Sequence, residues 1–220
     1  MEIIDKGTVI KKGAEAVLYK SSLWGLPVLV KYRRPKPYRN PQLDHHLRST
    51  RTLMEAKILS EVKKLGIPAP AVYWVDLEQC LIAMSFLEGI VLKEALPRLS
   101  EEEIKDVFFK LGEYAGAMHA RGIVHGDLTT SNVILCSGVP CLLDFGLSDF
   151  SKDLEHHAVD MHLMVRALES THYSLKDLCF SRFMEGYASA AGEHYAQLVK
   201  ERVNEIRRRG RYIEERRTRD

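Results

Sequence analysis

The chain has few cysteines, and it lacks the patterns that give cysteine a structural role. Cys80, Cys136, Cys141 and Cys179 form no Cys-x-x-Cys pair and have no histidine neighbour at zinc-finger spacing. Isolated residues of this kind are typical of reduced side chains in a protein core. We therefore expect a cytoplasmic protein without a disulfide framework or a zinc finger.

Long apolar runs are also absent, since none approaches the roughly 20 residues that a membrane helix needs. The first residues, MEIIDKGTVIKKG, contain only a short apolar stretch interrupted by charge, and this excludes a signal peptide as their interpretation. We expect no membrane contact. With 220 residues, of which 45% are hydrophobic, the chain can bury a sizeable core in one domain or in two lobes.

A large net charge is missing as well, but the charge is unevenly spread. The formal net charge is +2, whereas residues 202–220 hold eight arginines against four acids and sum to +4. This basic tail favours a contact with nucleic acid, because guanidinium groups fork onto phosphate oxygens. Gly210 should interrupt any helix there and leave a flexible arm. The alternative is a solvated helix end in which Glu214 and Glu215 pair with nearby arginines.

The most informative stretch is HGDLTTSNVILCSGVPCLLDFG, from His125 to Gly146. Its segment VILCSGVPCLLD indicates two short strands joined by a Ser-Gly turn. A tight hairpin brings its ends together, so Asn132 and Asp144 should lie side by side, with Asp127 one loop away. Clustered oxygen ligands of this kind suit Mg²⁺, which usually takes one or two carboxylates plus substrate phosphates.

The order of these residues is that of the protein-kinase signature: a catalytic-loop Asp, an Asn for metal, then Asp-Phe-Gly. We therefore predict Asp127 as the catalytic base and Asn132 and Asp144 as metal ligands. Taken singly, each residue has a plainer interpretation as a turn cap, an Asx turn or a loop start. The spacing and the Asp-Phe-Gly context favour the joint interpretation.

The segment from Ile3 to Tyr32 predicts three strands, the first of which ends in the sequence KKGAEA. A glycine between two strands can bring backbone N–H groups against a phosphate. We therefore predict that Gly13, Ala14 and Glu15 contact the nucleotide. Kinase loops usually have three glycines, so this loop would be a reduced version.

Lys31 ends an apolar, β-branched strand, as does the lysine that holds the nucleotide phosphates in the Val-Ala-Ile-Lys pattern. A helix expected over residues 50–65 places Glu55 on its apolar stripe. A carboxylate on an inward face needs a cation, and Lys31 is the candidate. We predict that Lys31 and Glu55 form a pair at the nucleotide site.

Between Lys31 and that helix lies YRRPKPYRNPQLDHHLRSTR, which is strongly basic and contains three prolines. We expect no regular element here. The segment is either a solvated connector or a surface that binds phosphate or a partner, and the sequence does not decide between them.

Two further strands, Val72–Leu77 and Cys80–Phe86, would complete a five-stranded small lobe. The residues that follow predict a hinge in which the backbone of Ser85 and Leu87 bonds an adenine edge. A second lobe then opens with a helix whose Ser100 and Glu103 form a capping box. Further helices are expected from Ala158 and over residues 174–202.

These features together resemble the small atypical protein kinase/ATPase subunit of the KEOPS complex, also called EKC. The residues that carry the resemblance are the Gly-Ala-Glu-Ala loop, Lys31, Glu55, HGDLTTSN, Asp-Phe-Gly and the arginine-rich end, so it covers nearly the whole chain. It implies an α+β, two-lobed protein-kinase-like fold. The parts would be a five-stranded antiparallel N-lobe (1–84), a hinge (85–89), a mainly helical, shortened C-lobe (90–202) and a basic C-terminal tail (203–220).

The resemblance also implies a function, namely Mg²⁺-dependent ATP hydrolysis or phosphoryl transfer in a complex that makes N6-threonylcarbamoyladenosine in tRNA. Members of that family are also serine/threonine protein kinases. The implied partners are a threonylcarbamoyl-transferase subunit at the C-lobe, a small regulatory subunit at the N-lobe, and tRNA through the basic tail.

The chain departs from ordinary protein kinases at two places. Gly126 stands where those enzymes have the arginine that pairs with a phosphorylated activation loop. Only thirteen residues, 147–159, separate Gly146 from Asp160, and no Ala-Pro-Glu follows. We therefore expect no phosphate switch and no full peptide platform, so a partner protein would have to supply activation.

Three alternatives remain. A small-molecule kinase shares His-Gly-Asp, but usually has a larger C-terminal lobe than this chain can hold. A Rio-type kinase is disfavoured by the Gly-Ala-Glu-Ala loop and the intact Asp-Phe-Gly. A pseudokinase scaffold is disfavoured because Lys31, Glu55, Asp127, Asn132 and Asp144 are all present.

Overall fold

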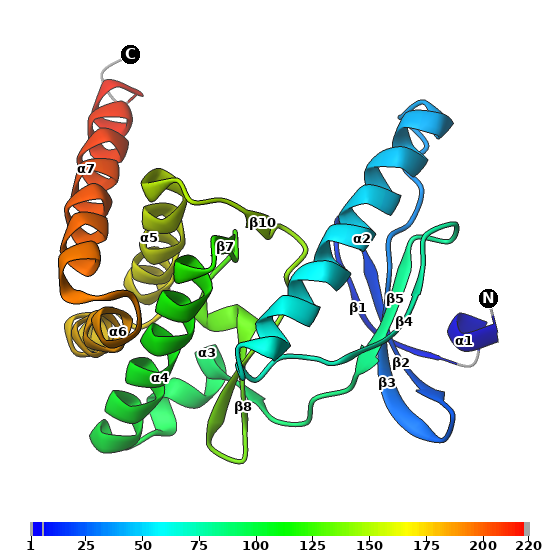
Figure 1. The fold of residues 1–220 in the computed structure, drawn as a ribbon, viewed down its shortest axis with the longest axis horizontal. Coiled ribbons are helices and arrows are strands. Elements are labelled where there is room, and N and C mark those ends of the chain that lie inside the picture. The colour runs from blue at the N-terminus through cyan, green and yellow to red at the C-terminus, as the bar shows by residue number, and fades with distance from the viewer. Residues whose placement is uncertain (1, 6, 218–220) are drawn as a thin grey trace. The chain divides into compact units, whose positions relative to one another are not determined.

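The computed structural model describes residues 2–5 and 7–217, and for residues 2, 5 and 210–217 it describes the backbone only. The chain divides into two compact units (Figure 1). The first comprises Met1–Glu88 with Phe145–Leu147, and the second comprises Gly89–Asp144 with Ser148–Asp220. Within the described residues, no helix combines the length and the apolar character needed to cross a membrane.

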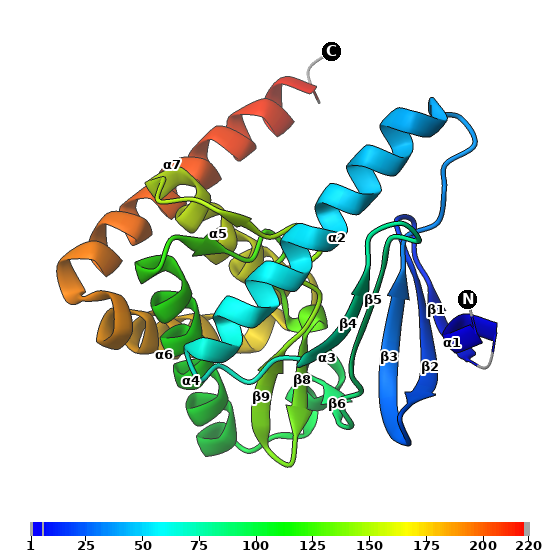
Figure 2. The same ribbon diagram turned by 45° about the vertical axis from the view of Figure 1, so that its right-hand side comes forward.

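The first unit is built on a five-stranded antiparallel sheet, as predicted. Its strands are β1 (Thr8–Lys12), β2 (Val17–Leu23), β3 (Leu26–Tyr32), β4 (Val72–Asp76) and β5 (Leu81–Ser85), in the order β1-β2-β3-β5-β4 (Figure 2). The prediction that a strand begins at Ile3 was wrong. A short helix, α1 (Glu2–Asp5), precedes β1, and Ile3 packs in the core of the sheet.

The side chains of β3 alternate between the two faces of the sheet, and only one set packs in the hydrophobic core. Val28 and Val30 are fully buried in one cluster with Leu81 and Ala83 of β5. Because successive side chains of a strand point to opposite faces, Lys31 and Arg33 share the other face. That face receives the carboxylate described below.

The long helix α2 (Pro41–Lys64) begins nine residues before the expected start, inside the basic segment that we took to be irregular. Asn40 caps it, because its side-chain oxygen accepts from the N–H groups of Gln42 (3.0 Å) and Leu43 (3.3 Å). Pro41 is tolerated in the first turn, where the N–H that proline lacks would have no helical partner. The helix packs on β4 and β5 and ends at Lys64, with Leu65 as its C-cap before Gly66 with φ +75°.

The second unit is mainly helical. It contains β6 (Ile90–Val91), α3 (Leu92–Ala95), α4 (Glu101–Ala120), β7 (Ile123–Val124), β8 (Val133–Cys136), β9 (Val139–Leu142), β10 (Asp149–Phe150), α5 (Leu154–Thr171), α6 (Lys176–Ala191) and α7 (Glu193–Arg217), with short 3₁₀ turns at Leu96–Arg98, Thr130–Asn132 and Tyr173–Leu175. The capping box of Ser100 and Glu103 at the start of α4 is confirmed.

Glycines let α4 and α6 approach with their backbones in contact. A Cβ atom on Gly112 would lie 1.9 Å from the carbonyl oxygen of Phe183, and one on Gly186 would lie 1.9 Å from that of Phe109. Any larger residue at either position would force the helices apart. The pairing fixes α4, whose C-terminal end leads through β7 into the loop at His125.

The C-terminal helix corrects the expectation that the tail is a flexible arm. α7 continues through Gly210 to Arg217, so the predicted interruption at Gly210 was wrong. One glycine in a helix interior costs only about 1 kcal/mol relative to alanine, and the arginines and glutamates beside it favour helix. The side chains of Arg207 and Arg209 pair with Glu169 and Glu155 of α5, respectively. The proposed pairing of Glu214 and Glu215 lies outside the described side chains.

Candidate functional site

Asp127 and Asn132 lie together in one loop of the second unit. The side-chain amide of Asn132 donates to the Asp127 carboxylate (2.7 Å) and to the Asp127 carbonyl (2.9 Å). The hairpin β8–β9 pairs Val133 with Leu142, and the N–H of Leu143 donates to the Asn132 carbonyl at 2.8 Å. The hydrogen bonds of this hairpin therefore place Leu143 beside Asn132, and Asp144 directly follows Leu143. The Ser137-Gly138 turn forms as expected.

Asp144 has an unusual backbone, with φ +57°. Few residues adopt this left-handed region, and Asp and Asn do so more readily than others because they bond locally. The conformation ends β9 and turns the chain at the start of Asp-Phe-Gly. An aspartate at this position can therefore adopt the backbone of the turn and also serve as a metal ligand.

The backbone before Asp127 is held by a buried carboxylate that the sequence analysis missed. Asp160 of α5 is fully buried and accepts from the N–H groups of His125 (2.7 Å) and Gly126 (2.8 Å). His119 of α4 lies 3.2 Å from the same carboxylate. Burial opposes ionisation of Asp160, but these hydrogen bonds and the facing histidines outweigh it and lower its pKa. Gly126 has φ +78°, a conformation that an arginine would adopt only with strain.

A cluster of rings extends this support across four helices. His119 stacks on His157 of α5, with centroids 4.1 Å apart, and bonds the hydroxyl of Tyr187 on α6 at 2.9 Å. His157 in turn bonds the hydroxyl of Tyr195 on α7 at 2.7 Å. Burial lowers the pKa of His157 to about 4 and also lowers the pKa of His125. Both imidazoles are therefore neutral near pH 7, which leaves the charge of Asp160 to orient the loop.

The first unit brings Lys31 and Glu55 together, in agreement with the expectation of an inward-facing pair. The Lys31 ammonium lies 2.7 Å from Glu55 Oε1, and the Arg33 guanidinium lies 2.6 Å from Oε2. All three side chains are buried. Arg33 was missed, although its position two residues after Lys31, directly after β3, placed it on the same face.

The loop of Gly13, Ala14 and Glu15 is tied to the basic segment rather than left open. The Gly13 N–H donates to the Ala16 carbonyl (2.9 Å), so it is already used within the turn. Lys36 donates to the Ala14 carbonyl, and Arg51 of α2 lies 2.5 Å from the Glu15 carboxylate. The hydrogen bond and charge of Arg51 outweigh partial burial and lower the pKa of Glu15.

Two hinge residues were expected to bond an adenine. The Ser85 N–H donates to the Ala71 carbonyl (2.8 Å), and its hydroxyl oxygen accepts from the Ala71 N–H (2.9 Å). These two groups of Ser85 therefore serve the first unit itself, and a contact of Ser85 with adenine stays a prediction. Leu87 follows outside β5, and its role stays a prediction.

The oxygen donors of the second unit suit a hard cation. Because the Asn132 amide nitrogen is used on Asp127, its oxygen is the atom left for a ligand, and Asp144 adds a carboxylate. Among the described residues no group of three or more His, Cys, Asp or Glu side chains gathers as a metal centre. A site with so few protein ligands fits Mg²⁺ completed by water and nucleotide phosphates, and it fits poorly a cation that needs an all-protein cage.

Comparisons with known proteins show the family to which the chain belongs. The family model "RIO domain" matches residues 31–166. "KEOPS complex subunit Bud32" of Pyrococcus abyssi is 42% identical over 212 residues, which cover 94% of this chain and 96% of the relative. A "probable bifunctional tRNA threonylcarbamoyladenosine biosynthesis protein" of Methanothermobacter thermautotrophicus is 37% identical over 206 residues, covering 94% of this chain but 37% of that longer protein.

A solved structure supports the fold. The Rio2 kinase–ADP/Mg²⁺–phosphoaspartate complex of Chaetomium thermophilum has a TM-score of 0.65 at 16% identity, covering 92% of this chain and 71% of that one. The α+β protein-kinase-like fold is thus confirmed. Asp-Phe-Gly does not separate the chain from RIO domains, contrary to our expectation, since it lies within the residues 31–166 that the RIO model matches; the Gly-Ala-Glu-Ala loop lies before them.

Proposed function

The chain belongs to the family of the KEOPS complex subunit Bud32, whose members carry a RIO-type kinase domain, and we propose that it acts as the ATP-using subunit of such a complex. Its task would be Mg²⁺-dependent ATP hydrolysis or phosphoryl transfer in support of N6-threonylcarbamoyladenosine formation in tRNA, in the cytoplasm. The observation that carries this proposal is the 42% identity to a named KEOPS subunit over nearly the full length of both chains.

The chemistry would rest on position and charge, because phosphoryl transfer leaves little covalent work for a protein. Asp127 would orient the attacking hydroxyl or water and take its proton, held in place by the Asn132 amide. Asn132 and Asp144 would hold Mg²⁺, which supplies neutralisation of phosphate charge when bound. Lys31, fixed by Glu55, would contact the phosphates. Serine/threonine protein phosphorylation is a second possible outcome of the same machinery.

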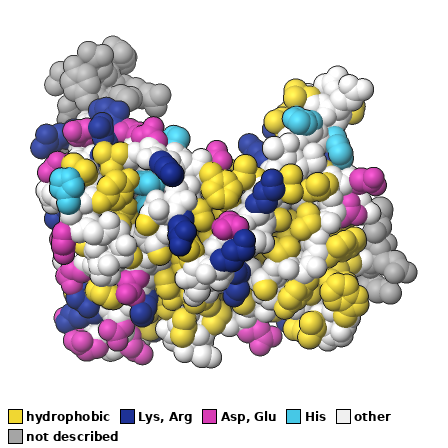
Figure 3. Space-filling view, in the orientation of Figure 1, with side chains coloured by type: hydrophobic (Ala, Val, Ile, Leu, Met, Phe, Trp, Pro, Cys, Tyr) yellow, Lys and Arg dark blue, Asp and Glu magenta, His cyan; other side chains and the backbone are white. Residues whose placement is uncertain are grey.

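Partners are proposed at two surfaces. The short segment after Gly146 exposes Leu147, Phe150 and Val159, with exposed fractions of 56%, 47% and 36%. Apolar side chains exposed there suit a contact with the threonylcarbamoyl-transferase subunit. On the first unit, apolar side chains also gather at the surface (Figure 3). The exposed apolar side chains of this unit include Leu43 and Trp74, and such side chains suit a contact with the small regulatory subunit.

The isolated chain is therefore expected to turn over ATP at least about ten-fold more slowly than the assembled complex. The thirteen residues after Gly146 form no long loop that could order this segment, so a partner surface has to do so. The test measures steady-state ATP turnover of the chain alone and with each partner subunit added. Equal rates for the lone chain and the complex would contradict the proposed dependence on a partner.

We further propose that the tail contacts tRNA through arginines that do not serve the fold. Arg208 is exposed, whereas Arg207 and Arg209 pair with α5. Replacing Arg208 with glutamine should reduce the log–log salt slope of tRNA binding by roughly 0.7–0.9, with unchanged melting. Replacing Arg207 and Arg209 is the matched variant, and it should lower the melting temperature as well. An unchanged slope in the first variant would make the tail structural.

A further inference from the structure

The basic segment between β3 and α2 forms a small recess that none of the roles above uses. Its lining is almost entirely cationic. It comprises Arg33, Arg34, Lys36, Arg39, Leu47, Arg48, Arg51 and Glu15. These six cations face three carboxylates that contact them, Glu15, Asp44 and Glu55, so the net charge of the group is +3. The surplus favours an anion in or over the recess.

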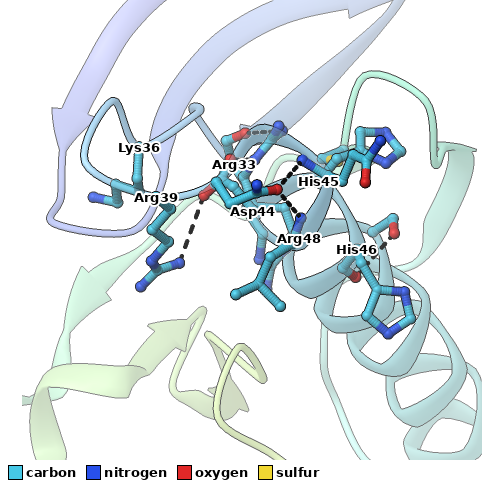
Figure 4. A network of polar contacts seen from close by, with 12 residues as sticks. Arg33, Lys36, Arg39, Asp44, His45, His46 and Arg48 are labelled. Carbon is cyan, nitrogen blue, oxygen red and sulfur yellow. Dashed lines mark hydrogen bonds and ion pairs between the residues drawn. The ribbon is translucent and has the colours of Figure 1, made fainter.

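Part of this charge is already used within the segment. Asp44, close to the start of α2, accepts from Arg48 Nε at 2.6 Å and lies 3.6 Å from Arg39 Nη1 (Figure 4). Burial opposes ionisation of Asp44, but the hydrogen bond from Arg48 and further contacts outweigh it and lower its pKa. Asp44 therefore holds two of the arginines in place. It does not neutralise the recess.

The buried side chain of Arg33 gives a reason independent of net charge to expect an anion in the recess. This side chain is 3% exposed, and only Nη2 is used, on Glu55. Nε and Nη1 have no hydrogen-bond partner among the described residues. A buried donor left unsatisfied costs about 1–3 kcal/mol, more when it is charged, so a ligand oxygen at this place is favoured.

The size of the recess limits what can enter it. Its volume is about 20 Å³, close to what a single water-sized oxygen needs. A whole base or ribose does not fit within this volume, whereas a single oxygen of an oxyanion does. The other oxygens would lie at the surface beside Arg34 and Arg51, both exposed. Several guanidinium groups in different orientations can bind the tetrahedrally arranged oxygens of a phosphate better than the two oxygens of a planar carboxylate.

We propose that this recess is an oxyanion subsite that takes one phosphate group, with one oxygen on Arg33 and the others on Arg34 and Arg51. The phosphate would displace Glu15, whose carboxylate now holds Arg51. Both partners of that ion pair are about half exposed, at 45% and 51%, so the pair is weak and exchange is easy. Because Glu15 belongs to the Gly13–Ala16 turn, binding would release this turn from α2.

The phosphate could come from a polynucleotide backbone or from a small phosphate ion. Next to the recess, the ring of Tyr38 is 75% exposed, and the Arg39 guanidinium lies 5.5 Å from its centroid. An exposed aromatic ring beside arginines suits an unstacked base next to a bound phosphate. The subsite itself requires only the phosphate, so the test separates the two sources.

The test titrates the full chain, at constant ionic strength, with inorganic phosphate and with a short single-stranded RNA, and follows the arginine Nε–H resonances by NMR. Arg34→Gln with Arg51→Gln should weaken binding about ten-fold or more. Glu15→Gln should tighten it about three- to five-fold, because a competing anion is removed. Lys36→Gln should weaken binding several-fold, whereas the matched variant Lys57→Gln, on the exposed face of α2, should leave it unchanged.

Each outcome decides the proposal. If the affinities for phosphate and for RNA both change in these variants, the subsite is supported. If only the affinity for RNA changes, the bound phosphate belongs to a polynucleotide. A response to phosphate alone assigns it to a small ion. If a glutamate-rich peptide binds as well as phosphate and loses affinity in the same variants, the surface recognises acidic protein and the proposal is wrong. Equal affinities in wild type and in the double arginine variant would also overturn it.

Discussion

Replacing Asp144 with alanine is expected to lower ATP turnover by about 10²–10³-fold in the active complex, because it removes a carboxylate that would hold Mg²⁺ against the phosphate charge. Asp144 is also held at φ +57°. Alanine adopts this conformation less readily than aspartate or asparagine, so part of any loss could come from the turn. Asp144→Asn is the sharper variant, since it keeps the shape and the turn and removes only the charge. It should lose nearly as much turnover as alanine does.

Asp127→Ala is expected to slow turnover by about 10²–10⁴-fold for a different reason, the loss of the base that orients the nucleophile. The two variants should separate in a Mg²⁺ titration. Asp144 variants should need far more Mg²⁺ for nucleotide binding, whereas Asp127→Ala should bind nucleotide normally. Asp127→Asn can still accept the hydrogen bond of Asn132, so it tests the base without removing the loop contact.

The control for both is Asp149→Asn, an exposed aspartate five residues after Asp144 whose carboxylate accepts from the Phe150 N–H. It changes the same charge in the same segment and should leave turnover unchanged. Wild-type turnover by Asp127→Ala in the assembled complex would contradict the proposed base. Wild-type Mg²⁺ dependence in Asp144→Asn would contradict the proposed metal ligand.

The features that could be predicted from the sequence are those that neighbouring residues decide. The β8–β9 hairpin follows from two apolar runs around Ser137-Gly138, and it brings Asn132 next to the strand that leads to Asp144. The inward position of Glu55 follows from its place on an apolar helical stripe. A buried carboxylate requires a cation, and this requirement identified Lys31 before the structure did.

The features that were missed depend on distant residues or on competing local preferences. Asp160 accepts from the N–H groups of His125 and Gly126, which lie 35 and 34 positions before it in the sequence. No local sequence pattern predicts a carboxylate with such backbone partners. Its position four residues before buried Met164 was the available signal. Prolines suggested an irregular segment before residue 50, but a proline in a first turn is compatible with the helix that Asn40 caps. At Gly210 the preference of its neighbours for helix prevailed.

Replacing Glu55 with alanine is expected to destabilise the first unit as well as slow the enzyme. The carboxylate of Glu55 bridges two buried cations. Its loss leaves the ammonium of Lys31 and the guanidinium of Arg33 without the anion that joins them. Breaking a buried pair from one side costs about 3–5 kcal/mol, which corresponds to a fall in melting temperature of roughly 6–20 °C.

Lys31→Met should behave differently, since Glu55 keeps Arg33 as its partner at 2.6 Å. Turnover should fall because the phosphates lose their cation, while the melting temperature should change by much less than in Glu55→Ala. The matched control on the same helix is Glu61→Ala, whose carboxylate is 45% exposed and pairs with Lys64 at the surface. Surface pairs of this kind contribute at most about 1 kcal/mol, so this variant should melt almost like wild type.

A double-mutant cycle measures the bridge directly. Lys31→Met and Glu55→Ala should not be additive in stability, and their coupling should be about 0.5–3 kcal/mol. The same cycle with Arg33→Met should show coupling of similar size, because both cations share one carboxylate. Turnover in the assembled complex should couple for Lys31 and Glu55 as well, since Glu55 acts on the phosphates through Lys31. Additive effects in both readouts would mean that the carboxylate does not position Lys31. Equal melting temperatures of Glu55→Ala and Glu61→Ala would mean that the buried bridge does not stabilise the first unit.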